Sequence, residues 1–139
     1  MADGKWISDL HPDTPVADAA RHVLTVRLEV VRDCLPPALD RPDEDPEHVH
    51  QLRVATRRAG AALRIFAPCL PEKAFKAARK ALRRLRRAAG AARDWDVFLE
   101  SLAQLGWPAA DKRRAALDFL TGYAMAQRAA AQDTLRAAL

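Results

Sequence analysis

Segment 47–66 repeats cationic side chains at helical spacing. His50, Arg53, Arg57 and Arg64 fall within about 60° of one another on a helix that turns about 100° per residue. The opposite side of the same helix is apolar and consists of Leu52, Ala55, Ala59, Leu63 and Phe66. This pattern predicts a helix that packs on one face and holds a row of cations on the other.

A second row of cations follows between residues 76 and 93. Its cations are Lys76, Arg79, Arg83, Arg86 and Arg93. Together with Gly90 they lie three and four residues apart on one helical stripe. Guanidinium groups bind phosphate oxygens bidentately and stay charged at neutral pH. A row that repeats once per turn, about every 5.4 Å, suits a chain of anions better than a single anion. Two such rows on neighbouring helices predict a groove for a polyanion.

The positive charge of the chain is concentrated in this region. The 139 residues have a net charge of +5, yet residues 50–93 hold thirteen Lys or Arg and a single acid, Glu72. The rest of the chain holds ten basic and seventeen acidic residues. A local excess of this size repels itself and disfavours the compact state unless an anion neutralises it. We therefore expect the rows to bind a ligand and not merely to form a solvated helix face.

His50 lies in phase with the arginines, so we expect it to donate a hydrogen bond to a bound anion and to become more cationic there. Neither a second histidine nor a carboxylate follows it three or four residues later, which disfavours a metal site. No nucleophile elbow and no phosphate-cradling glycine loop is present. The sequence therefore predicts no catalytic residue and no cofactor.

Asp94 and Asp96 follow the second row in the stretch "ARDWDV". Paired carboxylates can hold a metal for phosphoryl chemistry. We instead expect Asp94 to orient an arginine of the preceding helix or to cap the segment after Gly90. In that arrangement Trp95 and residues 97–99 pack into the core.

The elements that position these residues are all predicted to be helices, because half of the chain is hydrophobic and no strand-length alternating run is present. Thr14 and Pro15 predict the start of the first helix, and Pro36 with Pro37 its end. A second helix, with Asp45 as its cap, runs from Pro46 to about residue 67. A third runs from residue 72 to about 105, with an interruption at Gly90 that marks a bend, a break or a close contact between helices. A fourth covers about 109–138.

Short connections between long amphipathic helices indicate an antiparallel four-helix bundle. We assign residues 15–139 to this bundle and residues 1–14 to a flexible N-terminal segment. Cys34 and Cys69 lie in apolar stretches, which predicts buried thiols. No apolar N-terminal signal region and no run of about 18 apolar residues is present, so we expect a cytoplasmic protein.

Two other functions fit parts of the pattern. A nucleic-acid-binding helical module also presents basic helices, but single-strand binders usually add aromatic platforms, and no aromatic residue falls within the two rows. A phosphohydrolase accessory would use Asp94 and Asp96 with a metal.

The stretches "HVHQLRVATRRAGAALRIF" and "AAGAARDWDVFLESL" resemble the CHAD domain, the conserved-histidine α-helical domain. The residues that match its signature are His50, Arg53, Val54, Arg57, Arg58, Gly90, Arg93, Asp94, Asp96 and Val97. The resemblance covers roughly residues 15–139.

The resemblance implies an all-helical fold of two four-helix bundles related by a pseudo-twofold, with a basic channel that binds inorganic polyphosphate without catalysis. It adds Arg58 to the site. The expected polyphosphate ligands are then His50, Arg53, Arg57, Arg58, Arg64, Lys76, Arg79, Arg83, Arg86 and Arg93, with Gly90, Asp94 and Asp96 as structural support. It also implies association with a CYTH-type triphosphatase domain and with polyphosphate granules.

A full CHAD domain is about twice as long as this chain, which resembles the N-terminal half of that architecture. One wall of the channel is then missing. We expect either a homodimer that rebuilds the channel, a piece of a longer domain or a small free-standing variant.

Overall fold

The computed structural model describes residues 6–139, which form four α-helices and no strand. The helices are α1 (Val16–Asp40), α2 (Glu47–Ile65), α3 (Glu72–Ala103) and α4 (Arg114–Arg136), and a 3₁₀ turn, η1 (Ala67–Cys69), lies between α2 and α3. The predicted all-α class is therefore confirmed. Residues 1–5 of the predicted N-terminal segment lie outside the described residues, and in the described part the carbonyl of Ser8 lies 3.0 Å from Nε2 of His22 on α1.

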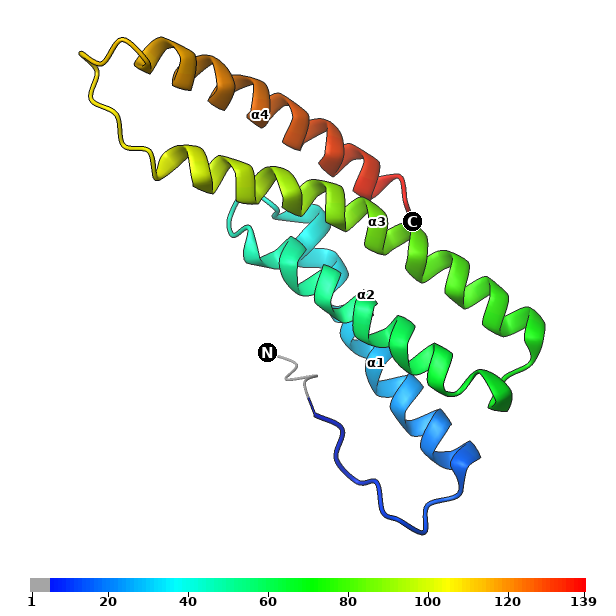
Figure 1. Ribbon diagram of the computed structural model, residues 1–139. Helices are drawn as coiled ribbons and strands as arrows, with labels where there is room; N and C mark the ends of the chain where they lie inside the picture. The colour runs from blue at the N-terminus through cyan, green and yellow to red at the C-terminus, as the bar shows by residue number, and fades with distance from the viewer. Residues whose placement is uncertain (1–5) are drawn as a thin grey trace.

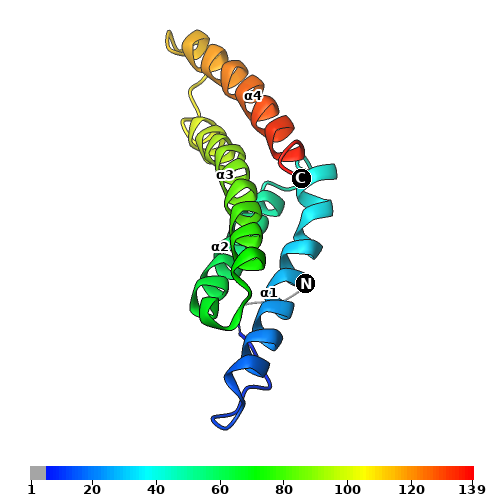
Figure 2. The same ribbon diagram turned by 90° about the vertical axis from the view of Figure 1, so that its right-hand side faces the viewer.

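The helices form two hairpins, α1–α2 and α3–α4 (Figure 1). Helix α1 packs on α2, α2 packs on the first part of α3, and α4 folds back along the second part of α3. Helix α4 meets α1 only near its own C-terminal end, where Gln132 donates to the carbonyl of Ala38 at 2.7 Å (Figure 2). The four predicted helices are present, but their predicted arrangement as a closed antiparallel four-helix bundle is not confirmed.

Two apolar clusters correspond to the two hairpins. The larger one joins Val31 of α1, Leu52 and Leu63 of α2 and Leu85 of α3, and Leu135 of α4 completes it. The smaller cluster lies between α3 and α4 and consists of Leu102, Leu117 and Ala124, with Trp95, Leu99 and Trp107 packed against them. The larger cluster therefore holds the two helices that carry the predicted rows of cations.

The ends of the helices follow the sequence only in part. The carboxylate of Asp45 accepts from the backbone N–H of Glu47 at 2.8 Å, as expected of a cap. The predicted Thr14 cap is wrong, because its hydroxyl accepts from the N–H of His11 and Pro15 occupies the cap position. The predicted end of α1 at Pro36 is also wrong.

Helix α1 continues through both prolines for one more turn, to Asp40. Ala38 in this turn is fully buried, and its carbonyl accepts the hydrogen bond from Gln132. The Nε of Arg136 also donates to the carbonyl of Leu39, at 3.2 Å. These tertiary contacts stabilise the turn and outweigh the local preference of proline to end a helix.

Gly90 does not interrupt α3, which is continuous over 32 residues. Of the three alternatives that a glycine at this position suggested, a close approach between helices is the one observed. A Cβ atom at Gly90 would lie 3.7 Å from Nε of Arg53 on α2. This is an ordinary van der Waals distance, so Arg53 of α2 lies against α3 at Gly90 without requiring a glycine there.

Several predicted core positions are exposed. Val97 and Phe98 are 45% and 38% exposed, whereas Trp95 and Leu99 pack against the smaller cluster. Only part of segment 95–99 therefore enters the core. Cys34 is half-buried and Cys69 is exposed, which contradicts the expectation of two buried thiols.

Candidate functional site

The rows of cations are brought together by the packing of α2 on α3. The contact is made by small and medium side chains, among them Ala55, Ala59, Leu82, Leu85 and Ala89. Small side chains at a helix contact shorten the distance between the axes. The cations on the outer flanks of the two helices therefore face a common space.

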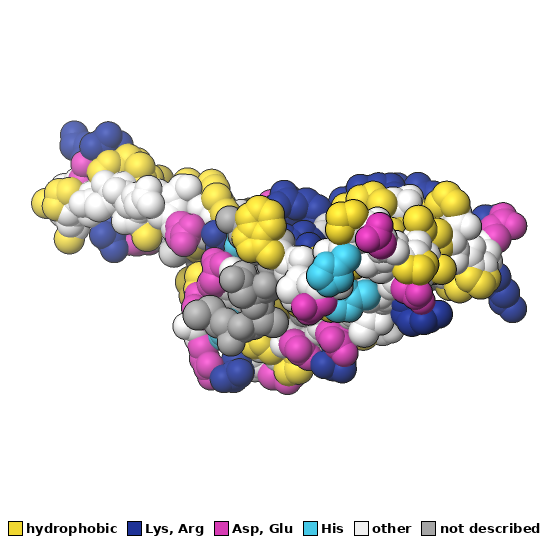
Figure 3. Space-filling model, turned by 90° about the horizontal axis from the view of Figure 1, so that it is seen from below, with side chains coloured by type: hydrophobic (Ala, Val, Ile, Leu, Met, Phe, Trp, Pro, Cys, Tyr) yellow, Lys and Arg dark blue, Asp and Glu magenta, His cyan; other side chains and the backbone are white. Residues whose placement is uncertain are grey.

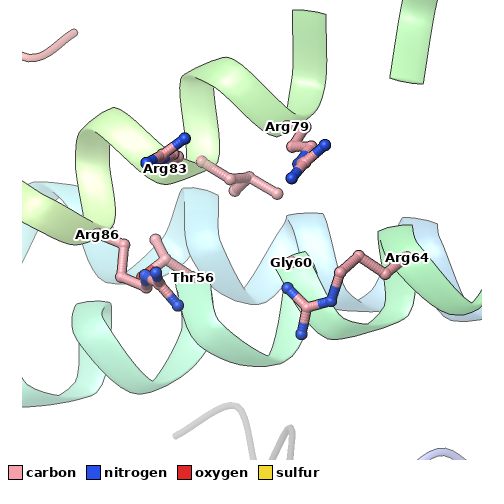
Figure 4. A pocket seen from close by; sticks show the side chains of 7 residues that line it. Thr56, Gly60, Arg64, Arg79, Arg83 and Arg86 are labelled. Carbon is pink, nitrogen blue, oxygen red and sulfur yellow. The ribbon is translucent and has the colours of Figure 1, made fainter. Parts of the chain in front are cut away.

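One part of this space is a pocket of about 280 Å³. Arg64 of α2 and Arg79, Arg83 and Arg86 of α3 line it, and Thr56, Gly60 and Leu82 complete the wall. Figure 4 shows the arginine side chains of both helices around the space above Gly60. No atom lies within 4 Å of where a Cβ at Gly60 would be, so the glycine leaves this part of the pocket open.

The second part adjoins the first at Arg86 and has a volume of about 540 Å³. Arg53 and Arg57 of α2 face Arg86 and Arg87 of α3 across it. Val54, Gly90, Ala91 and Asp94 also line this part. We call the two parts together the α2–α3 groove.

The arginines of the α2–α3 groove make no ion pair with any residue between 6 and 139. They are Arg53, Arg57, Arg64, Arg79, Arg83, Arg86 and Arg87, and a single carboxylate, Asp94, lines the groove with them. Like charges this close raise the free energy of the folded state, and a bound anion would remove that cost. The geometry therefore favours a ligand with several negative charges spaced along a chain.

Four of the predicted ligands do not line the α2–α3 groove. His50 is half-buried on α2 and lines neither part of the groove. Arg58 lies toward α1, where burial and then the nearby charge of Arg58 lower the pKa of Arg27. Lys76 pairs with Glu72 at 2.5 Å. Arg93 is only 17% exposed and lies 3.9 Å from Glu100.

Asp94 and Asp96 have different surroundings. Asp94 lines the α2–α3 groove and, among the residues described, forms no ion pair. Asp96 is buried and accepts from Nε of Arg128 at 2.6 Å. The two carboxylates therefore do not face a common site, and residues 6–139 contain no group of three His, Cys, Asp or Glu arranged to hold a metal ion.

Arg128 connects α3, α4 and the loop between α1 and α2. Besides Asp96 it pairs with Asp43, and it donates to the carbonyl of Pro42 at 2.7 Å. Burial alone would lower the pKa of Arg128, but its hydrogen bonds and ion pairs with Asp96 and Asp43 outweigh burial and raise that pKa. Arg128 therefore stays charged and holds α4 against the other helices.

The sequence did contain a signal for this residue. Arg128 lies in phase with Leu117, Ala124 and Leu135, the buried stripe of α4, and a charge on such a stripe needs a buried partner. Arg87 was missed for a different reason. It lies beside the predicted stripe of α3 and not on it, and only the position of α2 shows that its side chain reaches the groove.

Figure 3 shows one face of the molecule, on which Lys and Arg side chains form a band along the upper edge, while the rest of the face carries acidic side chains together with single Lys or Arg side chains. The basic side chains thus gather at one edge of this face, and the remainder carries both signs of charge. None of the helices described over residues 6–139 is both long enough and apolar enough to cross a membrane.

Comparison with known proteins gives one match. No curated protein and no solved structure is significantly similar to the chain. The family model of the CHAD domain matches residues 16–139, from the first residue of α1 to the end of the chain. The chain therefore belongs to the CHAD domain family.

Proposed function

We propose that this protein binds inorganic polyphosphate in the α2–α3 groove and does not act on it chemically. The single observation that supports this most strongly is the set of seven arginines from two helices that line one groove without ion-pair partners among residues 6–139. Each guanidinium can donate two parallel hydrogen bonds to a phosphate. Membership of the CHAD family is consistent with this ligand.

A polymer of phosphates fits the groove better than a single phosphate does. The arginines follow one another along α3 from Arg79 to Arg87, and a helix rises about 1.5 Å per residue, so they span about 12 Å. A single phosphate contacts only the cations around it. A chain of phosphates can contact all of them in turn.

Nucleic acid is the second candidate, since its backbone carries the same phosphate charges. Single-stranded nucleic acid is usually bound with bases stacked on aromatic side chains. The lining of the α2–α3 groove, all of it within the described residues, includes no aromatic side chain. This favours a polyanion that has no bases.

A metal-dependent phosphohydrolase is disfavoured because Asp96 is already bound to Arg128 and does not line the groove. We expect no phosphate release from polyphosphate or nucleoside triphosphates in the presence of Mg²⁺ or Mn²⁺. Turnover that disappeared in an Asp94→Asn protein would contradict the binding-module proposal.

The proposal is tested by titration with polyphosphate, single-stranded DNA and heparin at one ionic strength, followed by a salt series with polyphosphate. We expect the wild-type protein to prefer polyphosphate. Arg57→Ala combined with Arg83→Ala should weaken binding and flatten the slope of log affinity against log salt by about two, one for each phosphate contact removed.

Arg21→Ala combined with Arg32→Ala is a matched control, because it removes the same charge from exposed arginines of α1 that pair with Asp18 and Asp33. The control should leave affinity and slope nearly unchanged. Equal effects of the two double variants would show that net charge, and not the groove, determines binding.

The wider setting of the protein follows from the same ligand. We propose that the protein works in the cytoplasm at polyphosphate granules, and that it associates with a second copy of itself or with a CYTH-type triphosphatase domain. A second copy would place another cationic surface opposite the α2–α3 groove.

A further inference from the structure

Helix α3 has a second cationic flank, which adjoins the flank that lines the α2–α3 groove. Lys80, Arg84 and Arg87 are four and three residues apart, so they lie above one another at intervals of about one helical turn. None of them belongs to the stripe that runs from Lys76 to Arg93. This flank faces the C-terminal end of α4, because α4 folds back along α3 (Figure 1).

The space between this flank and α4 is a groove of about 860 Å³, which we call the α3–α4 groove. Six cations of α3 line it, together with two alanines of α3, one threonine of α4 and the two alanines that follow α4. The lining residues are Lys76, Arg79, Lys80, Arg83, Arg84, Arg87, Ala88, Ala91, Thr134, Ala137 and Ala138. No carboxylate is among them.

The cations of the α3–α4 groove are nearly without counter-charges in the described part of the chain. Only Lys76 has an ion-pair partner, Glu72. On α4, Asp133 is next to Thr134 in sequence, but its carboxylate pairs with Arg136 at 3.0 Å. Like charges at i and i+4 destabilise a helix. Such pairs recur along this part of α3: Lys76 with Lys80, Arg79 with Arg83, Lys80 with Arg84, and Arg83 with Arg87.

The partial negative charge at the C-terminal end of α4 opposes the binding of an anion, but it is smaller than the positive charge of the groove. The C-terminal end of a helix carries a partial negative charge of roughly half an electron, and α4 ends beside the groove. Arg84 already neutralises part of it, since Nη2 of Arg84 donates to the carbonyl of Leu139 at 3.2 Å. Lys76 is paired with Glu72, and the four cations that remain, Arg79, Lys80, Arg83 and Arg87, leave a positive excess.

We propose that the α3–α4 groove is a second binding site for phosphate polyanions, so that α3 binds phosphate on both flanks. This rests on the proposed function for the choice of ligand, but not for the existence of the site. Each groove has cations of its own: Arg57 and Arg64 line only the α2–α3 groove, and Lys80 and Arg84 line only the α3–α4 groove. Arg79, Arg83 and Arg87 line both grooves.

Two consequences follow from this arrangement. A short anion such as tripolyphosphate should bind twice to each chain, once on each side of α3. A long polyphosphate should cross α3 and occupy both grooves at once, so that its affinity exceeds that of either site alone.

The test is isothermal titration calorimetry with tripolyphosphate at low ionic strength, with three double variants of equal charge change. Lys80→Gln with Arg84→Gln removes the cations specific to the α3–α4 groove. Arg57→Gln with Arg64→Gln does so for the α2–α3 groove. Arg21→Gln with Arg32→Gln is the control on α1. Circular dichroism compares the helix content of all variants. If the Lys80→Gln with Arg84→Gln variant disturbs α4, the single variant Lys80→Gln replaces it, because it keeps the contact of Arg84 with Leu139.

We expect two tripolyphosphates per chain for the wild type and the control, and one for each groove variant. A stoichiometry of one in the wild type that is unaffected by Lys80→Gln with Arg84→Gln would overturn the second site and leave the proposed function intact. Loss of all binding in either groove variant would mean one shared site and would also overturn it. No binding of any polyphosphate by the wild type would contradict the proposed function itself.

Discussion

Gly60 shows how a single residue shapes the α2–α3 groove. It lies in the middle of α2 among arginines of both helices, and the space where its side chain would be is empty. Glycine within a helix is less favourable than alanine by about 1 kcal/mol. The glycine therefore weakens α2 slightly and keeps the groove open.

We expect Gly60→Ala to raise the free energy of unfolding by about 0.5–1 kcal/mol, because a methyl group fits without contact and lowers the entropy of the unfolded chain. Gly60→Glu should also fold, since its carboxylate would lie one turn from Arg64. It should weaken polyphosphate binding by about tenfold, or ~1.4 kcal/mol, by placing a negative charge among the arginines. Urea unfolding and anion titration of the two variants measure both effects, and equal affinities for the two would contradict the position of the groove.

The two cysteines differ in environment, which gives a prediction of pH dependence. Burial, and to a smaller degree the nearby charge of Asp33, raises the pKa of the Cys34 thiol. The thiolate is the reactive form, so at a given pH Cys34 should react more slowly than a free thiol. Single-cysteine variants, Cys69→Ser and Cys34→Ser, treated with a thiol reagent between about pH 7 and 10 test this. The Cys34 rate should rise at higher pH than that of a model thiol and become normal in denaturant.

Residues on a regular stripe were predictable, and residues whose role depends on the neighbouring helix were not. Arg53, Arg57, Arg64, Arg79, Arg83 and Arg86 were found from spacing alone and line the groove. Arg93 is on the same stripe, but near that end of α3 it is largely buried beside Glu100. Lys80 and Arg84 line a groove only because α4 packs beside α3, and the spacing of residues within α3 does not reveal this packing.

At the scale of elements, the position of α4 depends on a few polar contacts. The smaller apolar cluster has only three buried residues, and α4 touches α1 only at one end. Arg128 joins α4 to Asp96 of α3 and to Asp43 and Pro42 of the loop after α1. Arg128 therefore adds polar contacts with α3 and with the α1–α2 loop to the apolar contacts of the α3–α4 hairpin.

We predict that Arg128→Ala lowers the free energy of unfolding by about 3 kcal/mol, because it leaves the carboxylate of Asp96 buried without its cation. For a chain of this size that corresponds to a fall of roughly 10 °C in the melting temperature. Arg21→Ala removes an exposed i,i+3 pair and should change stability by less than about 1 kcal/mol. Thermal unfolding followed by circular dichroism compares them, and similar melting temperatures for the two variants would show that Arg128 does not hold the hairpin.

The extra turn of α1 illustrates why element boundaries could not all be predicted. Two consecutive prolines are a local signal for the end of a helix, whereas the contacts of Ala38 and Leu39 with α4 are more than ninety residues away in sequence. Local signals were sufficient for Asp45 and for the start of α3. They failed where a distant helix stabilises the turn.

At the scale of the whole molecule, cationic side chains and large apolar side chains are both exposed. The cations of α3 face solvent, and the α3–α4 hairpin exposes Phe119, Tyr123 and Met125 at 72%, 50% and 60%. Two identical chains could face each other across a shared polyanion, and most homo-oligomers are twofold symmetric. Without an anion, the repulsion between the basic faces opposes this pairing, although salt limits its range to about 8 Å.

We therefore predict a dimer that is stabilised by polyphosphate or sulfate and that dissociates at low ionic strength without them. Size exclusion coupled to light scattering measures the mass under each condition. A strict monomer at high protein concentration, with and without polyphosphate, would rule out a shared channel and leave the grooves of a single chain as the binding sites.

The uneven distribution of charge along the chain has a further effect when the ligand is a large particle and not a short chain. The protein would be oriented on such a particle with the α2–α3 groove inward, and the residues outside 50–93, ten of them basic and seventeen acidic, would make up most of the outward surface. Once the particle is covered, its outer surface is again negative, but the charge now consists of protein carboxylates that are fixed in place and interspersed with cationic side chains. Further copies are then attracted less strongly than the first, so the coat should stop growing at a single layer.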